Sequence, residues 1–351
     1  MKLHLHIKLL ALLMSIILSS CTKIDDLPPV IHPTERNLFN STLHLGVNYE
    51  PYHYEGQHPG VEIPVSQIQE DLGLIAQTFD YFRTYTVEDN MDQVVPIAAG
   101  LNLQVALGVY CHPGDSLRTM QNIDKAVAIA ALYPGTVACF VIGNETNIKN
   151  DTNYVPSILV KEYMIYTKSK LIAYSLNIPI TSCITGGGAD PDYNDPTQEF
   201  CGVIMQACRD LNETGQRVIL LSMYPYWGQY YSGKNSPENI MAGMTWSYKH
   251  GIEQARKMYD VCSIIGEIGW PSASYDIPTA RENKTNEGIN FNTTLNWLTG
   301  NNEQYQAYNG FWFMMFDQPW KIHEPNEVGP HWGIYEKNGS QVPKFELPVI
   351  R

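Results

Sequence analysis

Eight short apolar runs, each followed by a longer amphipathic stretch, repeat along the chain and constrain its fold more than any other feature. The runs lie at residues 43–49, 79–85, 103–110, 137–145, 178–185, 217–226, 262–270 and 310–317. Helices are expected between them, for example at 66–78, 123–132, 155–174, 237–259 and 280–298. Strands that alternate with helices predict parallel βα units. The pattern therefore predicts a single (β/α)₈ TIM barrel over residues 41–351.

The spacing of the runs favours this barrel over a doubly wound sheet. From Gly46 to Asp317 the chain covers 271 residues in seven intervals, about 39 residues each. A minimal barrel has roughly 31 residues per unit, so modest loop insertions are implied. A doubly wound sheet would place a glycine-rich phosphate turn after its first strand, and EPYHYEGQHPG stands there instead. The run Gly186–Gly188 follows the fifth strand and leads into DPDYNDP, which predicts a loop.

The first 40 residues indicate export. Residues 1–20 have a basic start, a short apolar run and small residues, the pattern of a secretory signal that is too short to span a bilayer. Leu18-Ser19-Ser20-Cys21 resembles a bacterial lipobox, which implies cleavage before Cys21 and a lipid on its thiol. Residues 21–40 are acidic and proline-rich and predict a tether. We expect a lipid-anchored protein of the bacterial cell envelope, on the outer membrane. Ordinary secretion with an incidental Cys21 is the alternative.

The charge of the chain excludes some partners. Asp and Glu number 36 against 23 Lys and Arg, a net charge of −13, which disfavours nucleic acids and other polyanions. Tyrosines number 22 against 10 phenylalanines, an excess that suits neutral polar ligands. No cofactor or metal ion is expected, because the ten histidines and seven cysteines show no metal-ligand spacing. His53 and His58 are expected to be polar loop residues. The sequence leaves the oligomeric state open.

Six cysteines follow Cys21. Cys201 and Cys208 are the nearest pair along the chain and could oxidise after export. Most others lie in apolar runs, where buried free thiols are expected. Cys183 and Cys262 are predicted to be core residues.

Two carboxyl groups stand at the ends of predicted strands. Glu145 follows CFVIGN, and Glu267 follows SIIG. They are 122 residues apart, or three units, so the fourth and seventh strands should carry them to opposite sides of the barrel mouth. Opposed carboxylates among aromatic residues suit glycosidic bond cleavage, in which one protonates the leaving oxygen and the other attacks or activates water. Either Glu could instead form a structural ion pair with Arg83.

At these residues the sequence resembles glycoside hydrolase family 17, the β-1,3-glucanase family. VIGNET is similar to the acid strand of that family, and IGEIGWPS to its nucleophile segment. FRTYTVEDNMDQVVPIAAG, SMYPYW, and FDQPWK with EPNEVGPHWGIY resemble three further segments in the same order. The resemblance covers roughly residues 43–337 and looks like that of a bacterial lipoprotein member.

The resemblance implies a retaining mechanism on laminarin-type glucan, with Glu145 as general acid/base and Glu267 as nucleophile. Retention implies carboxyl groups about 5–5.5 Å apart and a raised pKa for Glu145. By the same resemblance Asn144 bonds the sugar 2-hydroxyl, Tyr224 orients Glu267, and Arg83 keeps a carboxylate charged. The remaining predicted substrate-binding residues lie at or after strand ends and are Tyr49, Tyr85, Tyr226, Trp270, Trp320 and Lys321. For Trp270, Tyr226 and Trp320, core packing is the alternative to stacking on sugars.

The sequence departs from the plant-type pattern of this family, and the departure leaves the reaction partly open. Plant-type members carry Glu where this chain has Gln318, and an acidic residue where it has Gly329-Pro330. Three hypotheses follow: a β-1,3-glucan hydrolase, a β-glucan transglycosylase with the same first half-reaction, and a non-catalytic surface glycan-binding lipoprotein. Endo or exo action and linkage tolerance depend on loops 50–64, 186–199 and 227–236.

Overall fold

The computed structural model describes residues 45–149, 151–185, 198–227, 259–274, 282–299, 309–323 and 327–350. All of them belong to one compact unit, Asn37–Arg351. The predicted signal, Cys21, the tether and residues 237–258 of one predicted helix lie outside the described residues.

Eight parallel strands close into a barrel in sequence order, and β8 pairs back onto β1. This arrangement confirms the predicted TIM barrel. The strands are β1 Leu45–Asn48, β2 Tyr81–Arg83, β3 Gln104–Val109, β4 Val137–Asn144, β5 Ile180–Thr185, β6 Val218–Ser222, β7 Cys262–Ile268 and β8 Gly310–Trp312.

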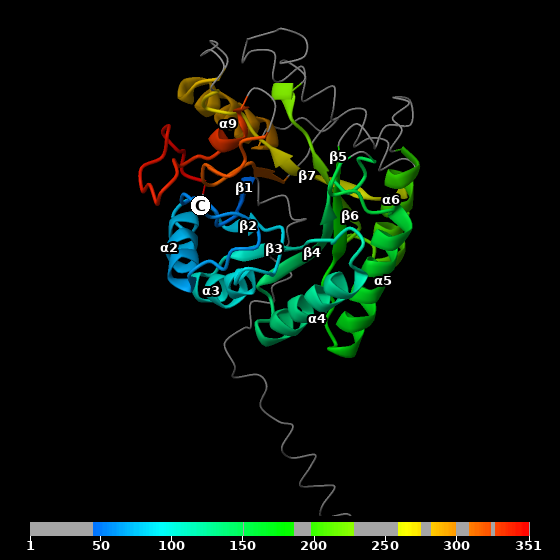
Figure 1. Ribbon diagram of the computed structural model, residues 1–351. Helices are drawn as coiled ribbons and strands as arrows, with labels where there is room; N and C mark the ends of the chain where they lie inside the picture. The colour runs from blue at the N-terminus through cyan, green and yellow to red at the C-terminus, as the bar shows by residue number, and fades with distance from the viewer. Residues whose placement is uncertain are drawn as a thin grey trace, which may run out of the picture. The chain divides into compact units, whose positions relative to one another are not determined.

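Helices connect the strands and lie along the outside of the sheet (Figure 1). They are α2 Val65–Ile75, α3 Val94–Leu101, α4 Ser116–Leu132, α5 Ser157–Ala173, α6 Gln198–Leu211 and α9 Lys284–Thr299, with 3₁₀ turns at Met91–Gln93 and Gly329–His331. Helix α4 begins seven residues before the predicted start, because the Asp115 carboxylate caps it by accepting from the Arg118 backbone N–H at 3.1 Å. Among the helices of the described segments, none has the combination of length and hydropathy that a bilayer crossing requires.

Two apolar clusters give the barrel its core. Alternate strand residues form the smaller cluster, which consists of Tyr81, Ala106, Cys139, Val141, Cys183, Val218, Leu220, Ile264 and Phe311. The larger cluster includes the apolar faces of the helices. The strands approach closely at Gly108, where a Cβ atom would lie 2.1 Å from the Thr84 carbonyl oxygen. Glycine is therefore needed at this position.

Three expectations about the fold need correction. Strand β8 ends at Trp312 rather than 317. After it, Phe313 still donates to Ile268 of β7 and Met315 to Asn48 of β1, but Met314 donates to the Trp332 carbonyl outside the sheet. Cys262 is exposed at the start of β7, whereas the other five described cysteines, including Cys183, are buried. All six are free thiols. His53 is fully buried, with Nε2 3.0 Å from the Asp71 carboxylate.

Candidate active site

Irregular backbone positions both Glu145 and Glu267. The register between β4 and β5 shifts between Val141 and Asn144, and Glu145 follows with a left-handed backbone at φ 48°. The Glu145 N–H still donates to the Cys183 carbonyl at 2.9 Å. The register between β7 and β8 also shifts between Ile265 and Ile268, the stretch that contains Glu267. Bulges re-aim side chains, and both carboxyl groups line one cavity of about 770 Å³. That volume is in the range of small-molecule binding sites.

Two neighbours hold the Glu267 carboxylate. Arg83 Nη1 donates to Glu267 Oε1 at 3.1 Å, and the Tyr224 hydroxyl donates to Oε2 at 2.6 Å. Arg83 Nη2 also donates to Asn144 Oδ1 at 2.6 Å, which joins the end of β4 to β7. Charge-assisted hydrogen bonds of this kind fix the orientation of a carboxylate.

Glu145 has a different environment. The pKa of Glu145 is raised to about 8. Burial is the largest cause and the negative charge of Glu267 adds to it, whereas a hydrogen bond with Ser222 and the charge of Arg83 oppose the shift. At neutral pH the Glu145 carboxyl group therefore carries its proton. A protonated Glu145 beside a Glu267 held by two donors has the asymmetry that acid-assisted displacement requires.

Seven of the predicted site residues line this cavity. Besides the two glutamates they are Tyr85, Asn144, Tyr224, Trp320 and Lys321. Lys321 Nζ lies 3.0 Å from Glu50 Oε2 and 4.8 Å from the centre of the Phe313 ring. Gln318 is buried and accepts from the indole Nε1 of Trp320 at 2.7 Å. The Gln318 amide thus holds the ring of Trp320, which lines the cavity.

Four predicted residues do not line the cavity. The side chains of Tyr49, Arg83, Tyr226 and Trp270 are fully buried. Tyr49 donates to Asp71 at 2.8 Å, Tyr226 donates to Glu282 at 2.7 Å, and Trp270 packs edge-on against Tyr226. Other side chains enclose Tyr49, Tyr226 and Trp270, which favours core packing of these three residues over contact with a sugar. Arg83 contacts Glu267 and Asn144.

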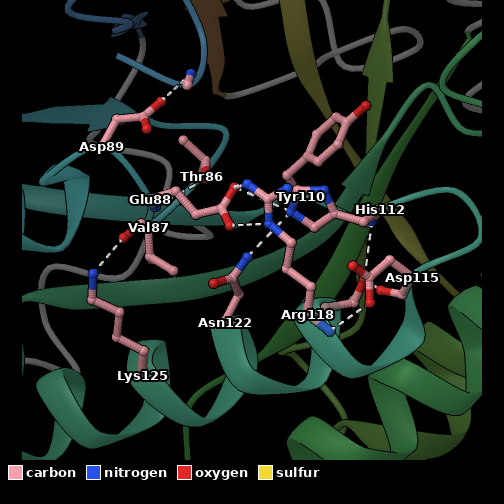
Figure 2. A network of polar contacts seen from close by, with 12 residues as sticks. Thr86, Val87, Glu88, Asp89, Tyr110, His112, Asp115, Arg118, Asn122 and Lys125 are labelled. Atoms are coloured by element: carbon pink, nitrogen blue, oxygen red, sulfur yellow. Dashed lines mark hydrogen bonds and ion pairs between the residues drawn. The ribbon is translucent and has the colours of Figure 1, made fainter. Parts of the chain in front are cut away.

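Several cavity residues were not predicted. The aromatic ones are Tyr52, Tyr110, Trp227, Phe313 and Trp332, and the polar ones include Glu50, Glu88, Asp89, His112, Arg118 and Asn153. Most of them follow the carboxyl end of a strand, which was the available signal. Figure 2 shows part of the polar group, with Arg118 and His112 pointing toward Glu88. Within the described ranges, no cluster of three or more His, Cys, Asp or Glu side chains could hold a metal ion.

Solved structures share this fold. An endo-laminarinase from Formosa superposes with a TM-score of 0.68 at 19% identity and covers 86% of this chain and 85% of its own. An active-site mutant of the Rhizomucor miehei β-1,3-glucanosyltransferase, in complex with laminaritriose, gives a TM-score of 0.63 at 15% identity and covers 89% and 100%. At these identities the likeness shows the fold alone.

Sequence comparison gives the family. The Aspergillus fumigatus protein named "Probable glucan endo-1,3-beta-glucosidase btgC" is 22% identical over 344 residues, which are 88% of this chain and 44% of that protein. The Aspergillus clavatus protein of the same name is 22% identical over 84% of this chain and 41% of its own length. The chain thus spans less than half the length of these curated relatives. The profile of the BtgE/BtgC glycoside hydrolase domain matches residues 46–333, so the chain belongs to that glycoside hydrolase family.

Proposed function

We propose that the protein cleaves β-1,3-glucan by a retaining mechanism, with Glu145 as the general acid/base and Glu267 as the nucleophile. One observation carries the proposal: two glutamates share a cavity, and one is held by Arg83 and Tyr224 while burial keeps the other protonated. The names of the btgC relatives and of the endo-laminarinase support β-1,3-glucan as the substrate.

In the first half-reaction, a Glu267 oxygen attacks the anomeric carbon as the bond from that carbon to the leaving oxygen breaks. Glu145 gives its proton to that oxygen, so no free alkoxide forms. Glu267 is then an ester without charge. Since the charge of Glu267 is one cause of the raised pKa of Glu145, that pKa falls in the intermediate. Glu145 is then ready to accept a proton from the attacking water.

Transfer to a sugar acceptor is the second candidate reaction, because it shares this first half-reaction. The Asp-Gln-Pro-Trp-Lys segment around Gln318 resembles bacterial family 17 members, some of which transfer glucan chains. A binding-only role has less support, because a binding cleft needs neither a protonated Glu145 nor an oriented Glu267.

The test is an assay of the purified chain on laminarin, mixed-linkage β-glucan and 1,6-linked glucan. Products are resolved by size and, within the first turnovers, by anomeric configuration. We expect β-configured products from laminarin and complete loss of turnover in Glu267→Ala, with binding retained. Initial α-configured products or near-normal turnover of the variant would contradict the mechanism. Products longer than the substrate would identify transfer.

For localisation, we propose that residues 1–20 are removed and that Cys21 carries a lipid. The sequence Leu18-Ser19-Ser20-Cys21 supports this. Wild type should fractionate with bacterial outer membranes, and Cys21→Ser should lose that association. Equal membrane association of both forms would exclude a lipid on Cys21.

A further inference from the structure

One wall of the cavity, formed by the loops after β2, β3 and β4 and by the first turn of α4, carries a cluster of polar side chains. We call Glu88, Tyr110, His112, Arg118 and Asn153, all of which line the cavity, the polar arm. The other aromatic lining residues are Tyr85 after β2, Tyr224 and Trp227 after β6, and Tyr52, Phe313, Trp320 and Trp332 from the segments after β1 and β8 and the loop before Gly333. Among the described residues, the hydrogen bonds, ion pairs and ring contacts of the polar arm do not include Glu145 or Glu267.

The polar arm is ordered around Glu88 (Figure 2). Arg118 binds the Glu88 carboxylate through two nitrogens, Nε at 2.6 Å and Nη2 at 3.0 Å. His112 Nε2 lies 3.1 Å from Glu88 Oε2. The Tyr110 hydroxyl donates to Asn153 Oδ1 at 2.6 Å, and its ring packs edge-on against His112. Groups held in this way lose little freedom when they bind a ligand.

The charges of the polar arm suit a neutral ligand. Partial burial opposes ionisation of Glu88, but hydrogen bonds from Arg118 and Asn122 lower its pKa, so Glu88 is ionised. Burial and the charge of Arg118 lower the pKa of His112, so its ring is neutral at pH 7. The charges of Arg118 and Glu88 then balance, so the polar arm has no excess positive charge that would attract an anion. Sugar hydroxyls both donate and accept, and this wall offers N–H and O–H donors beside carboxylate and amide acceptors.

We propose that the polar arm is a separate subsite that binds an unsubstituted glucose unit of the same glucan chain edge-on, through its hydroxyl groups. The proposal rests on the proposed function. An aromatic wall would stack on the flat face of a sugar ring. The side chains of the polar arm instead offer hydrogen bonds to the hydroxyl groups around the ring. A chain long enough to reach the polar arm gains these contacts, and a shorter chain does not, so the polar arm sets the preference for substrate length.

Arg118→Ala is the main test. The Arg118 side chain is 52% exposed, so its pair with Glu88 contributes little to folding. We expect kcat/KM on laminari-oligosaccharides long enough to reach the polar arm to fall about tenfold, the effect of one charge-assisted hydrogen bond. We expect kcat/KM on the shortest cleaved oligosaccharide to stay unchanged. The length ratio is kcat/KM on the long oligosaccharides divided by kcat/KM on the shortest cleaved one. Tyr110→Phe, which removes only a hydroxyl, should reduce this ratio by a smaller factor than Arg118→Ala.

Lys125→Ala is the matched control. Lys125 holds the same loop after β2, through the Val87 carbonyl at 2.9 Å and Asp92 at 2.9 Å, but does not line the cavity. The length ratio of Lys125→Ala should equal that of wild type. The proposal is overturned if Arg118→Ala leaves the ratio unchanged, lowers activity equally at every length, or behaves like Lys125→Ala. Absence of any turnover of β-1,3-glucan by wild type would instead overturn the proposed function.

Discussion

At the scale of single residues, different surroundings separate the two glutamates of the cavity. Glu145 is half-buried just after β4, and Glu267 is buried near the end of β7. Glu267 receives hydrogen bonds from Arg83 and Tyr224, whereas burial and the charge of Glu267 raise the pKa of Glu145 to about 8. The different partners of the two side chains therefore assign them different chemistry, although they are the same amino acid.

Glu145→Gln removes the proton that the leaving oxygen needs. We expect kcat on laminarin to fall by about 10²–10⁴-fold, the usual contribution of a general acid. Substrates with good leaving groups should recover part of the rate, because they need no protonation. In wild type, kcat/KM should decline on the alkaline side as pH rises through about 8. Kinetics on laminarin and on aryl glycosides check this, and an equal loss on both substrates would contradict the acid role.

The same carboxyl group should make stability depend on pH. The pKa of Glu145 is raised from 4.5 to about 8 on folding, so its contribution to stability is fully present below pH 4.5 and is lost as pH rises through 8. Gln cannot ionise, so Glu145→Gln should lose less stability than wild type across this window. Thermal unfolding of both proteins from pH 4.5 to 9 measures the difference. Parallel curves would show that Glu145 ionises normally in the folded protein.

The sequence predicts strand-end residues better than it predicts their exposure. Position at the end of a strand identified Glu145, Glu267 and Tyr224, since all barrel strands end at one rim. It did not show that Tyr226 is enclosed, because its partner Glu282 lies 56 residues further along the chain. Nor did it indicate the left-handed backbone of Glu145, which depends on the register of β4 with β5.

At the scale of elements, β7 packs tightly against its neighbours at Gly266, the residue before Glu267. A Cβ atom on Gly266 would lie 2.5 Å from Cys183 Sγ and 3.3 Å from Arg83 Nη1. The Gly266 carbonyl also accepts from Arg83 Nη1 at 2.8 Å. This strand therefore positions Arg83 and Glu267 together, and it can do so only without a side chain at this position.

Gly266→Ala should lower stability by about 1–3 kcal/mol through overpacking. It should also lower kcat, because Arg83 must move from Glu267. Gly73→Ala in α2 is the control: no atom lies within 4 Å of its added Cβ, and the change should stabilise by about 0.5–1 kcal/mol with unchanged activity. Urea unfolding and laminarin kinetics of the two variants test this. An active, fully stable Gly266→Ala protein would contradict it.

The order and type of the elements were predictable, but their ends were less so. Apolar runs separated by amphipathic stretches predict the barrel because each strand must be buried on both faces. The end of β8 was not predictable, since the Met314 amide just after it pairs with Trp332, which lies in a later loop. Local sequence also did not mark where backbone hydrogen bonds pass from the sheet to a loop.

At the scale of the whole molecule, a C-terminal residue ties several elements together. Lys344 is buried, with Nζ 2.7 Å from Asp317 Oδ1, 2.7 Å from Ser272 Oγ and 3.9 Å from Glu287 Oε2. These groups belong to the segments after β8 and β7 and to α9. Burial raises the pKa of Glu287 well above its usual value and also raises that of Asp317, and the charge of Lys344 opposes both shifts. Lys344 therefore compensates two buried carboxyl groups.

Lys344→Ala should destabilise the protein by about 3–5 kcal/mol, because removal of one partner leaves buried charge without compensation. The pKa of both carboxyl groups should then rise further. The loss should be largest at neutral and alkaline pH and should shrink as acid protonates Asp317 and Glu287. Lys337→Ala, which breaks an exposed pair with Glu55 in the same segment, should change stability by less than about 0.5 kcal/mol. Denaturant unfolding of both variants at pH 5 and pH 8 measures these effects. A Lys344→Ala loss that is the same at both pH values would mean that packing of the lysine stem, rather than its charge, joins the C-terminal segment to the barrel.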